Sequence, residues 1–207
     1  DAVQAVGKIP LDFHELNATA VAFGAHKFHG PRGIGGLLLR RGVALPPLLE
    51  GGHQESGRRA GTEPVPLIAG MAKALEVFAA SQPAQTIHVQ TLRDQLQDHL
   101  QQYCGPTVVH GRDAPRLPNT LSIAFPGLSG EAILINLDLA GVACSLGSTC
   151  ASGSAEPAPA LLAMGCAPDV CLSSVRFSVS HLNTSAEIAE AARRIQSVIE
   201  RLRGLPA

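Results

Sequence analysis

Lys27 occupies a position where a lysine can do covalent chemistry. It follows His26 and the apolar run at residues 21–24, and the Gly- and Pro-rich loop at residues 27–33 then leads to a second apolar run at residues 35–39. A lysine at the end of a strand can face a pocket, where desolvation or a neighbouring cation lowers its pKa and allows a Schiff base with a carbonyl compound. Taken alone, the pattern also fits an ordinary loop lysine.

Asp1 and Thr62 are candidate partners for such a carbonyl compound. The distance from Asp1 to Lys27 suits a strand, a crossover and a second strand, so the Asp1 carboxylate can face the same pocket and hold a proton on a pyridine nitrogen. Gly61 and Thr62 end a Gly- and Arg-rich connection and offer backbone N–H groups and a hydroxyl to a phosphate. A solvated carboxylate and an ordinary turn remain open as simpler interpretations.

Cys150 is the best candidate nucleophile among the five cysteines. It lies in the small-residue loop at residues 145–153, which leaves a thiol exposed and able to move. An odd number of cysteines in a chain of 207 residues argues against a disulfide framework and for reduced thiols. The spacings lack the C-x2-C pattern of zinc sites, so no metal is expected. Three other cysteines are expected to be small buried apolar residues: Cys144, Cys166 and Cys171.

Arg176 lies in an expected strand at residues 174–179. Its neighbours Val175 and Phe177 are apolar, so the guanidinium should lie on the opposite face of that strand. There it can offer a bidentate fork to a carboxylate, although an exposed strand arginine is the ordinary interpretation.

Strands and helices alternate along the chain, which indicates an α/β architecture. The expected helices cover residues 66–80, 86–102, 131–139 and 184–202, the last opened by a capping box. Besides the two strands beside Lys27, the expected strands cover residues 107–110, 120–125, 142–143 and 174–179. Ser81, Gln82 and Pro83 end the first helix, so we place a domain boundary between residues 1–82 and residues 83–207.

Composition excludes several classes of protein. A net charge of -1 disfavours a basic nucleic-acid-binding protein. The apolar stretches fall short of the roughly 18 residues that span a bilayer, so no membrane segment is expected. Residues 1–10 have no basic start, apolar run or cleavage site, so a signal peptide is not expected, and the cytoplasm is the expected compartment.

Five ordered blocks of sequence resemble the cysteine desulfurases of the NifS/IscS type. They are residues 1–4 (DAVQ), 25–36 (AHKFHGPRGIGG), 52–62 (GHQESGRRAGT), 147–152 (GSTCAS) and 173–178 (SSVRFS). The resemblance spans essentially the whole chain and implies a fold-type I enzyme that depends on pyridoxal 5'-phosphate (PLP). Residues 1–82 would then be the C-terminal part of the PLP-binding large domain, and residues 83–207 the small α/β domain. The resemblance does not include the family's N-terminal half, so we expect these residues to be a proteolytic or split half whose partner completes the site.

The resemblance implies a role for each cofactor residue. Lys27 is similar to the Schiff-base lysine, Asp1 to the partner of the pyridinium nitrogen, Gln4 to the partner of the ring hydroxyl and His26 to a phosphate-side residue. Thr62 resembles the phosphate contact given to the neighbouring subunit's cofactor, which implies a homodimer. Gly24 stands where the family carries a serine, so one hydroxyl contact to the phosphate is missing.

The resemblance also implies the reaction. Arg176 would hold the substrate carboxylate, and Cys150 would take sulfur from L-cysteine as a persulfide, leaving L-alanine. The sulfur would pass to a scaffold or carrier protein for iron–sulfur cluster or thiocofactor assembly. The alternatives are a selenocysteine lyase or other class V aminotransferase-like PLP enzyme, and a non-catalytic fragment that needs a partner chain.

Overall fold

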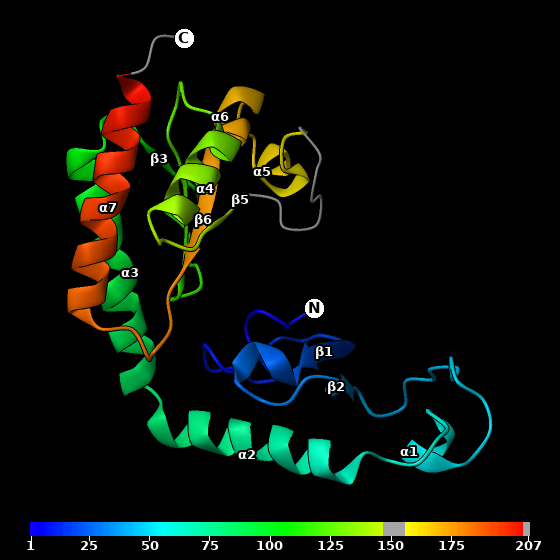
Figure 1. Cartoon of the computed structure of the whole chain (residues 1–207). Helices are drawn as coiled ribbons and strands as arrows, with labels where there is room; N and C mark the ends of the chain where they lie inside the picture. Colours follow the sequence, from blue (N-terminus) through cyan, green and yellow to red (C-terminus); the bar gives the residue numbers. More distant parts are fainter. Residues whose placement is uncertain (147–155, 205–207) are drawn as a thin grey trace. The chain divides into compact units, whose positions relative to one another are not determined.

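The chain folds as two units, Asp1–Pro83 and Ala84–Ala207 (Figure 1). The computed structural model describes residues 1–146 and 156–204, so Cys150 and the rest of its loop lie outside the described residues. The boundary between the units follows Pro83, one residue beyond the expected position.

The first unit is built on an antiparallel hairpin. Strands β1 (Ala20–Gly24) and β2 (Gly35–Leu39) pair in register from Ala20 with Leu39 to Gly24 with Gly35, which confirms the two expected strands. The 3-10 turn η1 (Ala25–Phe28) follows β1 directly. Gly35 must be glycine, because a Cβ there would lie 2.5 Å from the carbonyl oxygen of Phe23 on the partner strand.

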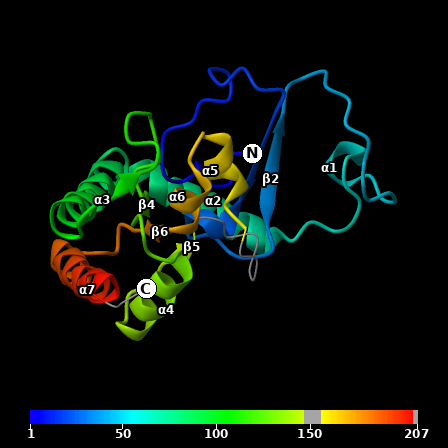
Figure 2. The ribbon, with the colours of Figure 1, turned by 90° about the horizontal axis from the view of Figure 1, so that it is seen from above.

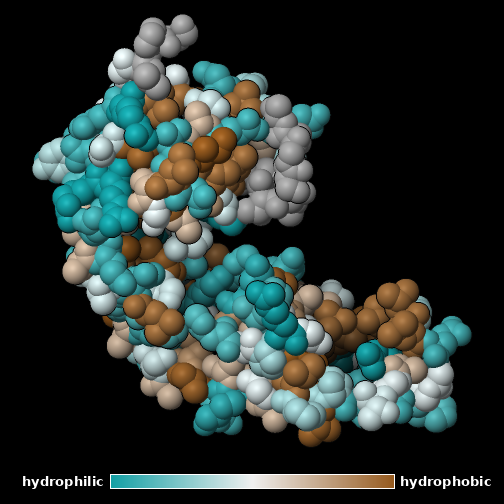
Figure 3. Space-filling view, viewed as in Figure 1, coloured by the Kyte–Doolittle hydropathy of each residue, from teal (hydrophilic) through white to brown (hydrophobic). Residues whose placement is uncertain are grey.

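A helix with almost no charge ends this unit. The short α1 (Gln54–Gly57) precedes α2 (Val65–Ser81), which matches the expected helix, and the only charged side chains of α2 are the ion pair Lys73 and Glu76. No residue of α2 is buried, although a helix this apolar is normally covered on at least one face. Apolar surface also gathers over the segment between β2 and α1, where Leu48 is 96% exposed (Figure 3).

The second unit is a four-stranded antiparallel sheet in the order β3-β4-β6-β5. Its strands are β3 (Val108–Val109), β4 (Thr120–Ala124), β5 (Ser145–Leu146) and β6 (Ser174–Ser178). One face is covered by α3 (Ala84–Tyr103), α4 (Gly130–Leu139) and α7 (Ser185–Arg203). The short helices α5 (Pro159–Ala163) and α6 (Pro168–Leu172) lie beyond the other face (Figure 2).

One expected strand of this unit is wrong. Residues 142–143 form no strand, because Val142 N–H bonds back to the carbonyl of Leu137 and the backbone is still leaving α4. The strand begins instead at Ser145, in what was expected to be loop, where Ser145 pairs with Arg176. No helix in the described part of the chain is long and apolar enough to cross a membrane.

The core of the second unit lies between the sheet and the three long helices. Fully buried side chains come from both sides of this layer: Leu92, Leu100, Leu121, Ile123, Ile133, Val175, Ile195 and Ile199. The expected capping box opens α7, since Thr184 N–H bonds Glu187 Oε2 at 2.8 Å and Glu187 N–H bonds Thr184 Oγ1 at 3.2 Å. This unit therefore contains its own hydrophobic core.

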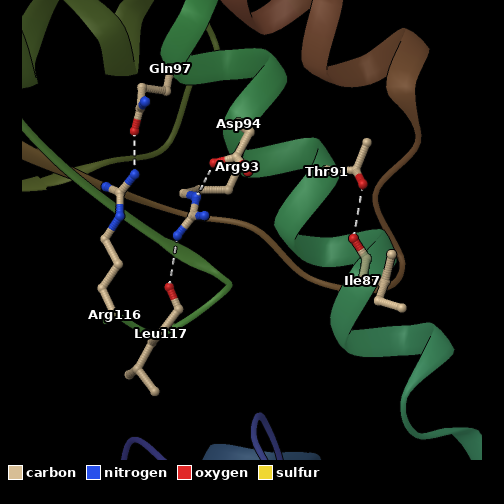
Figure 4. A network of polar contacts seen from close by, with 7 residues as sticks. All are labelled: Ile87, Thr91, Arg93, Asp94, Gln97, Arg116 and Leu117. Carbon is tan, nitrogen blue, oxygen red and sulfur yellow. Dashed lines mark hydrogen bonds and ion pairs between the residues drawn. The ribbon is translucent and has the colours of Figure 1, made fainter. Parts of the chain in front are cut away.

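Two arginine contacts fasten the connection before β4 to α3 (Figure 4). The buried Arg93 binds the Asp94 carboxylate at 2.7 Å and donates to the carbonyl of Leu117 at 3.0 Å. Arg116 donates to the side chain of Gln97 on the same helix. These contacts fix where the chain enters β4.

Candidate active site

The turn that carries Lys27 is held by its buried residues. Ala25 and Phe28 are 0% and 3% exposed, whereas Lys27 between them is exposed. Gly30 N–H bonds the carbonyl of Ala25 at 2.9 Å, and a Cβ on Gly30 would lie 2.9 Å from the Ala25 side chain. His29 closes the turn in the left-handed region at φ 65. Lys27 thus stands directly after β1 on a turn held by a backbone hydrogen bond and by buried neighbours.

The segment with Asp1 and Gln4 lies against this hairpin. Ala2 N–H bonds the carbonyl of Ala22 in β1 at 2.9 Å, and Gly7 packs so tightly on Phe28 that an added Cβ would lie 2.2 Å from the Phe28 Cβ. The segment and the Lys27 turn therefore belong to one structure. The expected strand and crossover between them are wrong, because residues 3–9 form turns held by backbone bonds within the segment.

The side chains of Asp1 and Gln4 are both exposed. Asp1 Oδ1 accepts from Val3 N–H at 2.8 Å, and Gln4 Oε1 accepts from Lys8 Nζ at 2.7 Å. The second oxygen of Asp1 accepts no hydrogen bond from a described residue.

Thr62 follows a loop that is fixed by side chain to backbone bonds. Gly61 N–H bonds Gln54 Oε1 at 3.1 Å, and Arg59 Nη1 donates to the carbonyl of Ala60 at 2.9 Å. Thr62 itself is exposed, and its hydroxyl forms no hydrogen bond within the described residues. His26 is exposed too, beside the extended backbone of Gly24.

Arg176 lies in the middle of β6 in the second unit. Its neighbours Val175 and Phe177 are 0% and 4% exposed and belong to the core, so the guanidinium is on the other face of the sheet, as expected. Within the described residues its buried Nε has no hydrogen-bond partner. Such a buried donor needs an acceptor, and a carboxylate ligand would supply one.

The described cysteines differ in environment. Burial raises the pKa of Cys104 and of Cys144 to about 11, and it raises the pKa of Cys171 as well, so these thiols stay protonated at neutral pH. Of the three cysteines expected to be small buried apolar residues, Cys171 is buried, whereas Cys144 and Cys166 are only half-buried. Sγ of Cys166 lies 3.4 Å from Nδ1 of His110. Cys166 and His110 lie far apart in the chain, so no local sequence pattern predicts their contact.

The free groups of the first unit suit a phosphate-bearing pyridine aldehyde such as PLP. Of the three lysines, Lys8 donates to Gln4 and Lys73 pairs with Glu76, whereas Lys27 has no hydrogen bond or ion pair with a described residue. PLP requires an amine for its aldehyde, a carboxylate for its ring nitrogen and a hydroxyl for its phosphate. The unpaired amine, the carboxylate with a free oxygen and the free hydroxyl supply these groups. Among residues 1–146 and 156–204, no three His, Cys, Asp or Glu side chains are grouped so as to hold a metal.

The family follows from these features and from comparison with known proteins. A model of the class-V aminotransferases matches residues 1–190, and the chain belongs to this family. It is 44% identical over 203 residues to a cysteine desulfurase of Gluconacetobacter diazotrophicus, covering 98% of this chain and 51% of that protein. A cysteine desulfurase of Rhodobacter capsulatus is 43% identical over 206 residues, covering 100% of this chain and 53% of that protein. The chain thus spans about half the length of these relatives.

Solved structures give the same result. A NifS-like protein superposes with a TM-score of 0.85 at 33% identity, covering 98% of this chain and 52% of its own. A NifS-like protein from Rickettsia africae has a TM-score of 0.86 at 29% identity, covering 96% and 52%. SspA in complex with cysteine has a TM-score of 0.69 at 27% identity, covering 88% and 50%. The resemblance to NifS-type enzymes and the fold class, part of a fold-type I PLP enzyme, are confirmed.

Proposed function

We propose that this chain is the C-terminal half of a PLP-dependent cysteine desulfurase, which converts L-cysteine to L-alanine and holds the sulfur as a persulfide on Cys150. The observation that carries the proposal is the Lys27 turn: a rigid turn with an unpaired amine, packed against the segment that holds Asp1 and Gln4. The identity of 43 to 44% to cysteine desulfurases over nearly the whole chain supports it.

In the first unit, which we assign to the cofactor domain, the residues divide the work of binding. Lys27 would hold the cofactor through its aldehyde and would move the Cα proton of the substrate. The Asp1 carboxylate keeps the pyridine nitrogen protonated by charge pairing. Gln4 donates to the ring hydroxyl, and His26 and Thr62 contact the phosphate. When bound, PLP supplies the electron sink for the substrate carbon.

In the second unit, which we assign to the small domain, two residues act on the substrate. Arg176 binds the carboxylate of L-cysteine, which gives the buried Nε an acceptor. The Cys150 thiolate attacks the substrate sulfur, so an S–S bond forms while the substrate C–S bond breaks. The electron pair of that bond stays on the carbon, which takes a proton and becomes the methyl group of alanine.

The same proposal includes the partners of the enzyme. We propose a homodimer in which Thr62 contacts the neighbouring subunit's cofactor, an N-terminal half that completes the site, and a scaffold or carrier protein that receives the sulfur. The apolar α2, with no buried residue, supports a further polypeptide that covers it. We place the enzyme in the cytoplasm, since the four described cysteines are all free.

Borohydride reduction in the presence of PLP tests the role of Lys27. Reduction should fix the cofactor on Lys27, and the blocked lysine should resist trypsin, so that residues 9–32 appear as one modified peptide. Lys8 and Lys73 are internal controls, since both are engaged by neighbouring side chains. Equal modification of all three lysines would contradict the proposal.

Turnover of L-cysteine tests the reaction itself. The assembled enzyme should produce alanine and sulfide in the presence of a reductant, and Cys150→Ala should abolish this activity. If the wild type had no activity on L-cysteine and Cys150→Ala remained active on selenocysteine, the chain would belong to a selenocysteine lyase instead.

A further inference from the structure

Three polar side chains of the second unit meet in a cluster that the proposed reaction does not use. Sγ of Cys166 lies 3.4 Å from Nδ1 of His110, and Nε2 of the same ring lies 2.8 Å from Oγ of Ser174. His110 and Ser174 are 7% and 1% exposed, whereas Cys166 is half-buried in the connection between α5 and α6. A thiol, an imidazole and a hydroxyl are thus aligned from the surface inward.

The hydrogen bonds of Ser174 fix the tautomer of the ring. Ser174 donates its single hydroxyl proton to the carbonyl of Val170 at 2.7 Å. Towards His110 it can therefore only accept, so Nε2 carries the ring proton. The lone pair of the neutral ring is then on Nδ1, which faces Cys166. This arrangement makes His110 an acceptor for the thiol proton, and Ser174 the residue that orients it.

The charge state of the ring agrees with this geometry. Burial lowers the pKa of His110 below its ordinary value, so the ring is neutral and able to accept a proton at pH 7. The other described cysteines lack such a partner, and burial raises their pKa values. Cys166 is thus the one described thiol that combines exposure with a base.

The cluster lies on the same face of the sheet as Arg176. Ser174 and Arg176 are two residues apart in β6, so their side chains project from one face. The backbone of His110 bonds the carbonyl of Ser122, and Ser122 is the register partner of Arg176. The face that carries the proposed substrate-binding arginine therefore also carries a second thiol with its own base.

We propose that Cys166 is a nucleophilic thiol that accepts sulfane sulfur from a persulfide, R–S–SH. As Sγ attacks the outer sulfur, its proton passes to Nδ1 of His110. The S–S bond of the donor breaks, its electron pair leaves on RS⁻, and His110 returns the proton to give R–SH. The product is a persulfide on Cys166, and no oxidant is needed. A single added sulfur suits a half-buried thiol between Gly165 and Ala167.

Peptide-resolved alkylation tests the base assistance. Cleavage after Leu162 and before Asp169 isolates Cys166 on residues 163–168, apart from every other cysteine. With iodoacetamide, the rate at Cys166 should change little between about pH 7 and pH 8, whereas an unassisted thiol of pKa about 8.5 reacts roughly eightfold faster at the higher pH. A full eightfold rise at Cys166 would overturn the proposal.

Two variants separate chemistry from folding. His110→Gln should lower the rate at Cys166 about 100-fold at pH 7, and Ser174→Ala should give a smaller decrease because the ring loses its orienting acceptor. Slow labelling of Cys104 and Cys144 reports that the fold is intact. If His110→Gln unfolds, Ser174→Ala and the wild-type pH profile test the role of His110 instead. An unchanged alkylation rate at Cys166 in a folded variant would contradict the assignment of His110 as the base.

Sulfur transfer is tested with two donors. With cysteine persulfide, residues 163–168 should gain one sulfur atom in wild type and far less in His110→Gln. With L-cysteine and PLP, a sulfur on this peptide that requires Cys150 would identify the protein's own persulfide as the donor; sulfur from the small molecule alone would identify an external donor. Absence of sulfur on Cys166 with both donors would refute the proposal, while the Lys27 and turnover tests stand independently.

Discussion

Several side chains of the first unit leave their functional groups without a hydrogen-bond partner. The side chains of Lys27 and Thr62 and one oxygen of Asp1 have no hydrogen-bond partner among the described residues, while backbone hydrogen bonds hold the segments that carry Lys27 and Asp1. A rigid backbone with free functional groups is the arrangement expected of a binding site, because little ordering remains to be done when the ligand binds. Gly24 is the one position here where a side chain could be added.

Gly24→Ser should tighten PLP binding. Gly24 has an extended backbone at φ -128, and a Cβ there would lie 3.4 Å from the His26 ring, so serine fits with a slight adjustment of His26. A hydroxyl that bonds a phosphate contributes about 1.5 kcal/mol, which corresponds to roughly tenfold in Kd. Titration of the absorbance with PLP measures this effect. Gly24→Ala is the matched control, and an equal gain with alanine would exclude the hydroxyl as the cause.

Arg176→Lys should raise the KM for L-cysteine in the assembled enzyme with a smaller effect on kcat. Lysine keeps the charge but loses the planar fork, and the buried Nε that lacks a partner disappears with it. Loss of one charge-assisted bond of about 2 kcal/mol corresponds to roughly 30-fold. Steady-state kinetics measure both constants, and an unchanged KM would remove Arg176 from the substrate site.

At the scale of elements, the sequence predicts the helices and strands that depend on neighbouring residues. It does not predict the pairing of segments that lie far apart in the chain. The capping box of Thr184 and Glu187 is a four-residue pattern, and α7 begins where it predicts. The strand β5 could not be found, because Ser145 and Leu146 are strand only through their pairing with β6. Likewise the contact of His110 with Cys166 depends on how β3 and the connection between α5 and α6 fold together. The positions of Lys27 after a strand and of Arg176 on the strand face away from the core could be predicted, because strand ends and alternation are local features.

The capping box makes the stability of the second unit depend on pH. Hydrogen bonds from Thr184 lower the pKa of Glu187. The carboxylate therefore stabilises the folded state above the ordinary Glu pKa of about 4.3, and this contribution is lost as the pH falls through the lowered folded-state value. Glu187→Gln keeps a capping side chain without the charge, so its deficit at pH 7 should vanish in acid. Urea unfolding at both pH values measures this, and a deficit independent of pH would disprove it. Thr184→Ala should cost about 1 kcal/mol.

At the scale of the whole molecule, the two units differ in how much core they contain. The buried apolar residues of the first unit are few: Ala2, Val21, Ala25 and Phe28. The second unit buries a continuous cluster between its sheet and three helices. We therefore expect the first unit of the isolated chain to be less stable than the second.

Limited trypsin digestion of the isolated chain should reflect this difference. The exposed Arg40, Arg41, Arg58 and Arg59 lie in connections of the first unit and should be cut first. A fragment that contains residues 84–204 should persist, because opening its core costs most of the unfolding free energy. Intact-mass analysis over time identifies the fragments. Simultaneous loss of both units would contradict the difference in stability, and added PLP should slow the first cuts.

The uncovered α2 has a consequence for synthesis. A ribosome makes this helix before any of the second unit, so the helix emerges ahead of the largest hydrophobic core of the chain. While synthesis of the second unit continues, a nearly uncharged helix is exposed in a crowded cell, where chaperones bind such segments and proteases remove them.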